Sequence, residues 1–328
     1  MERPIDFVIC WVDGGDPDWL KEKKRYSPDN NNDDRDIRYR EWGILKYWFR
    51  GVEKFAPWVN KIHFVTWGHT PSWLNVKHPK LNIVKHEDYI PSKYLPTFSS
   101  RPIELNLHRI KGLSEQFVFF NDDMFLLKPV KKEDFFKNGL PRDIAAQDVV
   151  VHNDFVHSIA EFNAIMLINK YFTKQNVLKS NPLKWIRLRY GRHLLRTLLL
   201  MPWRNFTGFF DPHLPNSYLK STFEDVWKKE GELLEEVTSH KFRDKSDVTQ
   251  YFFRSWQLAS GNFIPRKNLG KIFKIDINHN KAIKVIENQS NKLICINDGE
   301  DTKDFEEKLK EISNGFDQIL SNKSGYEI

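Results

Sequence analysis

Three short apolar runs in this chain are followed by acidic or amide side chains, and this pattern constrains the fold more than any other feature. The runs are residues 5–12, 117–120 and 293–296, and the side chains that follow them are Asp13, Asn121, Asp122, Asp123, Asn297 and Asp298. Short apolar runs of this kind are typical of buried strands. Asp and Asn are also common turn residues, so the pattern gains meaning only if the strand ends lie together. Ligands of open α/β sheets bind beyond the carboxyl ends of the strands, where such ends meet.

Helical segments alternate with the apolar runs. Residues 45–55 and 103–110 carry apolar side chains at helical spacing, with Pro57 and Gly112 as stop signals, and residues 61–67 and 81–84 resemble strands. This alternation predicts an α/β fold with a Rossmann-like, mostly parallel sheet. Residues 27–36 are polar and predict a loop, whereas 218–240 and 246–260 predict helices. We expect an α/β core over 1–152, a mostly helical insertion over 153–260, and a C-terminal strand and helix over 261–328 that rejoin the core.

Charge and cysteine content narrow the setting. The formal net charge of +7 suits an anionic partner, although solubility alone explains it equally well. Cys10 and Cys295 lie inside apolar runs, as expected for buried thiols in a reducing compartment. The polar start MERPID does not resemble a signal peptide, and no apolar stretch approaches the roughly 20 residues of a membrane span. These features predict a cytoplasmic protein.

The acids at the strand ends predict chemistry as well as fold. Hard oxygen ligands clustered at one edge of a sheet suit Mg²⁺ (or Mn²⁺) bound together with substrate phosphates. Asp122 and Asp123 are the first metal candidates, with Asn297 and Asp298 as partners, although either pair also suits sugar hydroxyls. The pattern therefore points to a nucleotide-diphosphate donor and a metal-assisted transfer.

Four sequence blocks resemble the Stealth family of bacterial sugar-1-phosphate transferases, which is related to the animal phosphotransferase that marks lysosomal enzymes. The blocks are IDFVICWVDGGDPDW, RYREWGILKYWFRGVEKFAPWVNKIHFVTWG through IELNLHRIKGLSEQFVFFNDDMFL, PHLPNSYLKSTFEDVW through HKFRDKSDVTQ, and LICINDGED. They stand in the family order and span most of the chain. Residues 160–205 have no counterpart that can be assigned.

The resemblance implies a reaction. An acceptor hydroxyl attacks the β-phosphate of a UDP-sugar, UMP leaves, and a phosphodiester joins the sugar to a glycan acceptor, in capsular or cell-surface polysaccharide synthesis. The strand end CWVDGGDPDW would then hold the nucleotide, with Trp11 and Val12 against uracil, Asp13 as a polar anchor and the glycines allowing close backbone approach. Residues 1–152 become the nucleotide-sugar-binding core.

The resemblance also assigns roles to charged residues. His213 matches the family histidine and is expected to be the general base, since a histidine near its usual pKa accepts a proton at neutral pH. Arg243 matches a family arginine whose planar fork suits phosphate oxygens, and Asp247 is placed to orient it. Asp123 joins His213 and Arg243 in the catalytic set. Arg38 and Arg40 are expected at the donor diphosphate, or else in solvent at a helix start.

A cluster around residues 99–109 matches the family as well. The matching residues are Ser99, Ser100, Glu104, His108 and Arg109. Helical spacing places Glu104, His108 and Arg109 roughly on one side of a helix, where sugar binding and a structural Glu104–His108 pair are both open. His108 is the second candidate for the base. Arg101 receives no role.

The segment KWIRLRYGRHLLRTLLLMPW combines apolar residues with Lys184, Arg187, Arg189, Arg192 and Arg196. A basic amphipathic helix can lie on an anionic membrane surface, and a core helix of the insertion fits the pattern as well. The family context favours a lipid-linked glycan acceptor and peripheral contact with the inner membrane face.

Two competing functions remain open. A conventional glycosyltransferase using the same UDP-sugar would release UDP in place of UMP. A non-enzymatic binder of an anionic polymer fits the charge, but the chain carries no zinc spacing, helix-turn-helix signature or aromatic RNA motif, so no nucleic-acid partner is expected.

Overall fold

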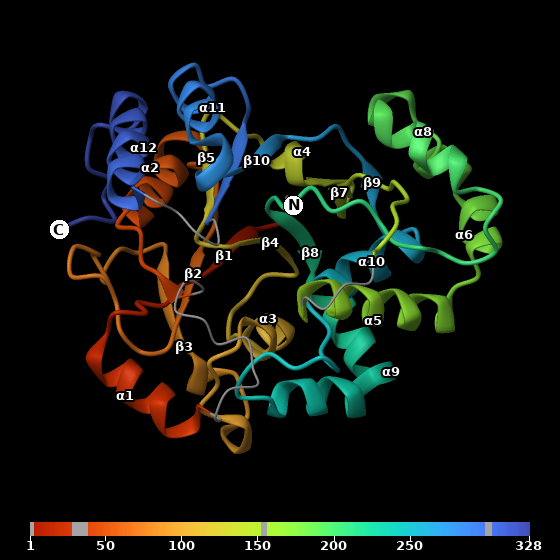
Figure 1. Ribbon diagram of the computed structural model, residues 1–328, viewed down its shortest axis with the longest axis horizontal. Coiled ribbons are helices and arrows are strands. Elements are labelled where there is room, and N and C mark those ends of the chain that lie inside the picture. The colour runs from red at the N-terminus through yellow and green to blue at the C-terminus, as the bar shows by residue number, and fades with distance from the viewer. Residues whose placement is uncertain (1–2, 28–38, 152–155, 299–303) are drawn as a thin grey trace.

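The computed structural model describes residues 3–27, 39–151, 156–298 and 304–328, and every structural statement below refers to these residues. A five-stranded sheet with the order β3-β2-β1-β4-β8 forms the centre (Figure 1). Its strands are β1 (Ile5–Cys10), β2 (Ile62–Thr66), β3 (Leu81–Lys85), β4 (Gln116–Phe120) and β8 (Asn216–Leu219). The first four are parallel, and β8 pairs antiparallel with β4. The predicted mostly parallel α/β sheet is confirmed.

Two smaller sheets adjoin the central one. In the first, β11 (Leu293–Asn297) lies between β10 (Gly270–Lys274), to which it is parallel, and β5 (Met124–Leu126), to which it is antiparallel. The second contains β6 (Phe136–Lys137), β7 (Leu140–Asp143) and β9 (Ile264–Pro265). Because β5 follows β4 after only three residues, the first small sheet begins where the central sheet ends.

Helices cover both faces of the central sheet (Figure 1). One side carries α2 (Leu45–Phe55), α11 (Ile275–Glu287) and α12 (Phe305–Ile319), whose buried residues share a core with Phe7 and Ile9 of β1. The other side carries α5 (Val156–Tyr171), α9 (Lys220–Ser239) and α10 (Tyr251–Ala259), which share a core with Val8. The remaining helices are α1 (Pro17–Tyr26), α3 (Ser100–Leu105), α4 (Lys132–Phe135), α6 (Lys174–Ser180), α7 (Pro182–Trp185) and α8 (Arg192–Leu199).

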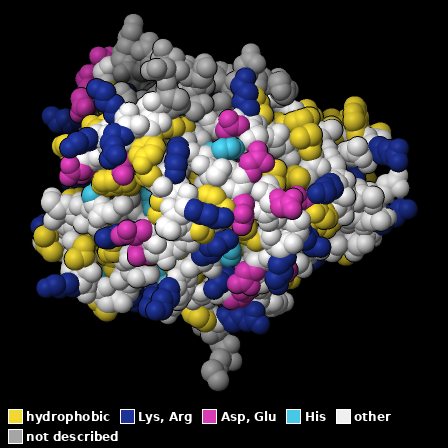
Figure 2. Space-filling model, turned by 90° about the horizontal axis from the view of Figure 1, so that it is seen from below, with side chains coloured by type: hydrophobic (Ala, Val, Ile, Leu, Met, Phe, Trp, Pro, Cys, Tyr) yellow, Lys and Arg dark blue, Asp and Glu magenta, His cyan; other side chains and the backbone are white. Residues whose placement is uncertain are grey.

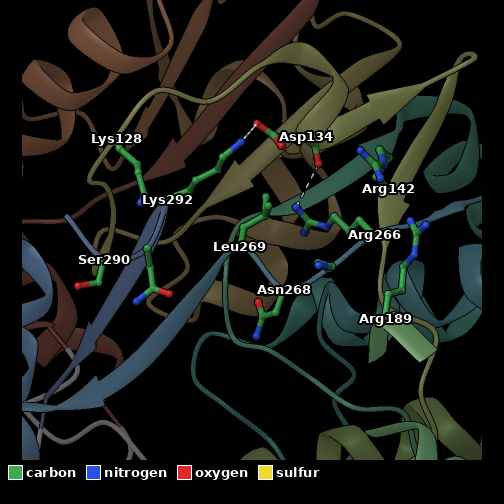
Figure 3. A pocket seen from close by; sticks show the side chains of 11 residues that line it. Lys128, Asp134, Arg142, Arg189, Arg266, Asn268, Leu269, Ser290 and Lys292 are labelled. Carbon is green, nitrogen blue, oxygen red and sulfur yellow. Dashed lines mark hydrogen bonds and ion pairs between the residues drawn. The ribbon is translucent and has the colours of Figure 1, made fainter. Parts of the chain in front are cut away.

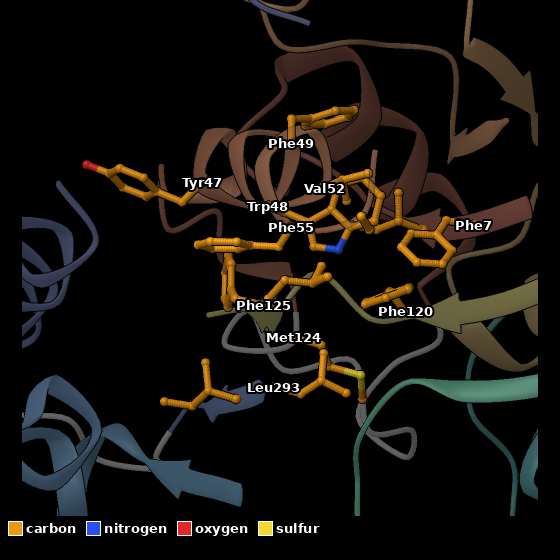
Figure 4. Close-up of a cluster of buried hydrophobic side chains, with 14 of the residues drawn as sticks. Phe7, Tyr47, Trp48, Phe49, Val52, Phe55, Phe120, Met124, Phe125 and Leu293 are labelled. Atoms are coloured by element: carbon orange, nitrogen blue, oxygen red, sulfur yellow. The ribbon is translucent and has the colours of Figure 1, made fainter. Parts of the chain in front are cut away.

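Aromatic packing fixes α2 against the sheets. Figure 4 shows Trp48 of α2 beside Phe7 and Phe120, with ring centroids 6.5 and 5.4 Å away, whereas Phe49 points to the other side of the helix. Gly51 permits the approach, since a Cβ there would lie 3.2 Å from the Leu126 carbonyl oxygen of β5. Tight contact between α2 and β5 holds the loop between β4 and β5, which carries Asp122 and Asp123, in a fixed position.

Several predicted elements match the structure, and one is wrong. The strands at 5–12, 61–67, 81–84, 117–120 and 293–296 and the helices at 45–55, 218–240, 246–260 and 303–321 are present as β1, β2, β3, β4, β11, α2, α9, α10 and α12. Residues 103–110 do not form one helix. The helix α3 ends at Leu105, and a 3₁₀ turn over Leu107–Arg109 follows. The Asn106 side chain stabilises the break by donating hydrogen bonds to the Pro102 carbonyl and the Thr238 hydroxyl.

The predicted regions are joined by strand pairing. The strand β8 comes from the segment predicted as a helical insertion, yet it completes the central sheet beside β4. The C-terminal strand β11 pairs with β5 from the first region. The domain boundaries remain a prediction. Most of the loop predicted at 27–36 lies outside the described residues, and none of the helices in the described part of the chain is long and apolar enough to span a membrane.

Candidate active site

Acidic strand ends from separate parts of the chain meet beside β4. The Asp123 carbonyl accepts a hydrogen bond of 2.9 Å from the Ile296 backbone, and the Cys295 thiol donates to the Asp123 carboxylate at 3.2 Å. The end of β1 is also close. Burial is the main cause that raises the pKa of Cys10, and the charges of Glu104 and Asp122 raise it further, so both carboxylates lie near this strand end. The predicted convergence of strand ends is therefore present. On the face shown in Figure 2, acidic side chains and histidines lie near one another among basic side chains.

The adjacent carboxyls of Asp122 and Asp123 repel each other. Crowding by surrounding protein, then the nearby charges of Asp123 and Glu41, raises the pKa of Asp122 to about 7. Burial also raises the pKa of Asp123, although His213 opposes the shift. The Asp123 Oδ1 atom is buried and accepts no hydrogen bond from the described residues. A carboxylate oxygen in this condition is a suitable ligand for a cation.

His213 lies between two carboxylates. Its Nε2 is 3.9 Å from Asp123 Oδ2, and its Nδ1 is 3.7 Å from Asp211 Oδ2 and 3.2 Å from the Tyr251 hydroxyl. The backbone of His213 has φ of 46°, which is uncommon for a residue other than glycine. A hydrogen bond of 2.7 Å from its N–H to Asp211 Oδ1 stabilises this turn. The turn thereby directs the ring toward Asp123.

The same carboxylates change the protonation of His213. Burial acts to lower its pKa, but the hydrogen bond with Asp211 and the charges of Asp123, Asp211 and Glu104 outweigh burial and raise the pKa to about 9. The histidine is therefore an imidazolium at neutral pH in this structure. The expectation of a pKa near the usual value is wrong, because the sequence does not show the acids that fold around the ring.

A second group of polar residues lies beside the first. Glu104 is buried, accepts hydrogen bonds from the Ser100 side chain and the Gln250 backbone, and lies close enough to Arg243 for their charges to interact. Its charge also reaches His213. The structure therefore brings Ser100, Glu104 and Arg243 together with the histidine, as the sequence predicted.

Asp247 was predicted to touch substrate and to orient Arg243, but its side chain is fully buried. One oxygen accepts a 2.5 Å hydrogen bond from Arg101 and the other a 2.6 Å bond from His240. Arg101, which received no role, is therefore the buried partner of Asp247, and it also donates to the Asp244 carbonyl at 2.8 Å. This network holds the loop that carries Arg243, so Asp247 is a supporting residue and is not exposed to a ligand.

The nucleotide-binding role predicted for the end of β1 is also partly wrong. Trp11 is only 7% exposed and its ring stacks on Phe64, so it belongs to the core and does not face uracil. Its indole N–H donates to Glu41. A Cβ on Gly14 would lie 2.0 Å from the Tyr39 carbonyl oxygen, so this glycine is needed for the close contact with the Tyr39 backbone. The predicted role of Gly14, close backbone approach to a nucleotide, has no support. Val12 and Asp13 remain partly accessible, and the Asp13 backbone N–H donates to His69 Nε2 at 2.8 Å.

Three further predicted residues lie in other surroundings. His108 and Arg109 pack near Trp227 of α9, with the Arg109 guanidinium 4.6 Å from the ring centroid, because the break at Asn106 turns them away from the side of Glu104. Burial, followed by the charges of Arg109 and Lys220, lowers the pKa of His108 to about 3. Arg40 lies 3.5 Å from Asp298, so that carboxylate is paired with a cation in this structure. Arg38 lies outside the described residues.

Sequence reasoning missed four residues of the site. These are Asp211, Tyr251, Glu41 and Cys295. Only Asp211 had a visible signal, since an acid two residues before a histidine can hydrogen-bond within one turn. The others come from distant segments.

The donor set can be compared with the expected metal. Single ligand atoms of Asp123, His213 and Cys295 lie within 4.8 Å of one another. Burial raises the pKa of Cys295 well above its ordinary value, so without a cation its sulfur is a neutral thiol, and soft sulfur is a poor ligand for Mg²⁺ in any protonation state. The oxygens of Asp122, Asp123 and Asn297 are the hard ligands that Mg²⁺ prefers, and the Asn297 amide oxygen is 3.9 Å from the Cys295 sulfur. These residues fit a magnesium-type ion.

Comparison with known proteins agrees with the first two of the four sequence blocks and with the family over the full chain. The family model described as Stealth protein CR1, conserved region 1, matches residues 3–31, and that described as Stealth protein CR2, conserved region 2, matches residues 38–143. A capsular polysaccharide phosphotransferase WcwK of Streptococcus pneumoniae is 44% identical over 100% of this chain and 98% of its own length. A receptor polysaccharide phosphotransferase WefC of Streptococcus gordonii is 41% identical over 100% of both chains. Among solved structures, the apo form of the bifunctional glycosyltransferase WbbM is similar with a TM-score of 0.42 and 10% identity, over 97% of this chain and 51% of its own.

Proposed function

The chain belongs to the Stealth family of polysaccharide phosphotransferases, and from this premise we propose that it transfers a sugar 1-phosphate from a UDP-sugar to a glycan hydroxyl in capsular or cell-surface polysaccharide synthesis. The acceptor oxygen forms a bond to the β-phosphorus, the bond from that phosphorus to the bridging oxygen breaks, and UMP leaves with that oxygen. The observation that carries the proposal is the meeting of Asp122, Asp123 and the His213–Asp211 pair at the strand ends.

His213 is the proposed acceptor of the hydroxyl proton. Asp211 and Tyr251 occupy the Nδ1 side of the ring, so Nε2 is the atom that faces the reacting groups. Nε2 must lose its own proton first. Any neutralisation of the Asp123 charge favours that loss, because this carboxylate is one of the groups that hold the imidazolium.

A divalent cation is part of the proposal. Asp122 and Asp123 would hold it, with Asn297 as a further oxygen ligand and Asp298 as a reserve that is at present paired with Arg40. When bound, such an ion neutralises phosphate charge that develops during transfer. Val12 and Asp13 remain the proposed contacts to the nucleotide, and Arg40 and Arg38 those to the diphosphate.

Positive charge for the transferred phosphate is assigned to Arg243. Its guanidinium lies near the buried Glu104, which balances the charge and restricts the direction of the side chain. Ser100 and Glu104 are proposed to contact sugar hydroxyls. Arg101 and Asp247 act as positioning residues, because their buried pair holds the loop from which Arg243 projects.

A membrane surface is the proposed location. Trp185 and Tyr190 of the segment from α7 to α8 are buried in the core, but α8 itself buries only Thr197, and Leu188, Leu195 and Leu199 are 91%, 62% and 64% exposed. Exposed leucines beside arginines suit an anionic inner leaflet, where a cytoplasmic enzyme would meet a lipid-linked acceptor. The double variant Leu195→Ser/Leu199→Ser should sediment less with anionic vesicles at low salt. Failure of the wild type to bind such vesicles would contradict this location.

The nucleotide released decides the central proposal. The chain is incubated with Mg²⁺, a panel of UDP-sugars and a glycan acceptor, and the nucleotide is identified by mass. UMP together with a phosphodiester-linked product is expected. Release of UDP would establish a conventional glycosyltransferase and reject the phosphotransfer.

A further inference from the structure

A basic cleft lies apart from the acidic strand ends. Its volume is about 520 Å³. Figure 3 shows Arg142, Arg189 and Arg266 on one side of it and Lys128 and Lys292 on the other. Among the described residues, Asp134 is the only acid that lines the cleft, whereas the cationic lining residues are Lys128, Arg142, Arg189, Arg266, Lys267 and Lys292.

The one acid is already neutralised. Asp134 Oδ2 lies 2.5 Å from the Lys292 ammonium and accepts a further hydrogen bond from the Lys131 backbone. The other five cations therefore face the cleft without a carboxylate from its lining. Arg142 and Arg189 both donate to the neutral carbonyl of Pro265, at 3.2 and 3.4 Å.

Arg266 is the buried member of the group, with only 5% of its surface exposed. It donates one hydrogen bond of 3.3 Å to the Asp134 carbonyl, and its Nε, like that of Arg142, is buried without a hydrogen-bond acceptor among the described residues. The buried Asp143 carboxylate, whose charge reaches Arg266, is itself held by Arg254 through bonds of 2.7 and 2.9 Å. Burial lowers the pKa of Arg266 to about 10, with help from the charges of Arg254 and Arg142, and the carboxylates of Asp143 and Asp134 only partly oppose the shift. A buried cation with unused donors is costly unless an anion completes it.

We propose that this cleft binds the phosphate group of a phosphate ester. Several guanidinium groups with free N–H donors form the forked arrangement that suits phosphate oxygens. Two sources carry this chemistry, namely the phosphodiester of the glycan product and the headgroup of an anionic lipid. The first source rests on the proposed function, whereas phosphate binding itself does not.

The position of the cleft fits a ligand that extends from the active site. Lys292 immediately precedes β11, and Lys128 follows β5 after one residue. Cys295, beside Asp123, lies three positions after Lys292, which is roughly 10 Å of extended chain. A phosphate held here thus lies on the same small sheet as the reacting centre but outside it.

Calorimetric titration with inorganic pyrophosphate, in chelator and without donor sugar, tests the cleft. The variant Lys128→Gln/Lys267→Gln should weaken one binding event by about tenfold, because two partly or fully exposed cations are removed. The matched control Lys228→Gln/Lys229→Gln in α9 removes the same charge from another exposed surface and should leave that event unchanged. Arg266→Met should weaken pyrophosphate binding further. If that variant does not fold, the comparison of Lys128→Gln/Lys267→Gln with its control still tests the proposal. Equal affinity in the wild type, the cleft variant and the control, or no binding at all, overturns the proposal.

Competition identifies the source of the phosphate. Displacement of pyrophosphate by a soluble hexose phosphodiester assigns the cleft to the glycan, and displacement only by phosphatidylglycerol vesicles assigns it to a lipid headgroup. Displacement by neither at matched phosphate concentration rejects a phosphate ester as ligand. Because the readout is binding without turnover, an inactive chain would disprove the phosphotransferase function and leave this result intact.

Discussion

The two ends of the small sheet of β5, β11 and β10 differ in the sign of their charge. Asp122, Asp123 and Asn297 lie at one end beside His213, and a group of lysines and arginines lines the cleft at the other. The five residues of β11 span roughly 16 Å, which exceeds the screening length of about 8 Å at physiological salt. The two ends can therefore act as separate electrostatic sites, one suited to a cation and a proton acceptor and the other to an anion.

The largest expected effect is at the acidic end. Asp123→Asn should lower turnover by at least about 10³-fold, because it removes the proposed metal ligand together with a charge that, in this proposal, is worth several kcal/mol to the reaction. UMP release gives the rate, and an unchanged melting temperature would show that the fold survives. Asp122→Asn should behave similarly, and excess chelator should reproduce both losses in the wild type. Full activity in chelator would remove the metal from the mechanism.

His213→Ala should reduce turnover by roughly 10²–10⁴-fold while leaving UDP-sugar affinity nearly unchanged, since the proposed role is proton transfer from the acceptor. The wild-type rate should rise with pH as His213 loses its proton, because only the neutral ring accepts one, and the midpoint should lie below 9 when a cation neutralises Asp123. Parallel measurement of donor affinity and rate separates the roles. A proportional loss of both would make His213 a donor ligand.

The buried Arg101–Asp247 pair tests whether support and chemistry can be separated. Asp247→Ala should lower the free energy of unfolding by about 3–5 kcal/mol, because it removes the buried carboxylate that is ion-paired with the buried Arg101. Asp244→Ala, at a more accessible neighbour, is the matched control and should cost less. Denaturant titration measures both. Similar stability of Asp247→Ala and the wild type would show that water reaches Arg101.

The smallest effect contrasts the two ends through pH. The folded chain raises the pKa of His213 from 6.5 to about 9, so this residue stabilises the fold fully below pH 6.5, and the contribution disappears as pH rises to about 9. The difference in unfolding free energy between the wild type and His213→Asn should shrink by about 2–3 kcal/mol across that window. The cleft should contribute no such change through Arg266, whose pKa is about 10. A pH-independent difference would place the histidine pKa near its ordinary value.

Local patterns in the sequence were sufficient for the strands and helices of the α/β core. Apolar runs and helical spacing located β1, β2, β3, β4, β11, α2 and α12, because each signal lies within a few consecutive residues. The resemblance to family blocks added His213 and Arg243 to the candidate site. The periodicity of the sequence gives no information on the surroundings of these two residues. Short strands such as β5 and β8 were missed because three or four residues carry too little pattern.

Contacts between distant residues were decided only by tertiary structure. Arg101 and Asp247 are 146 positions apart, and the basic cleft collects side chains from six separate segments. Trp11 was placed at the ligand because its identity does not reveal which neighbours cover it. The sequence determined which groups are available and where the strands end. Folding determined which charged groups come together in low-dielectric surroundings. These contacts set the protonation of His213, the burial of Asp247 and the unpaired donors of Arg266. The reason is that electrostatic energies depend on distance and solvent exposure rather than on order along the chain.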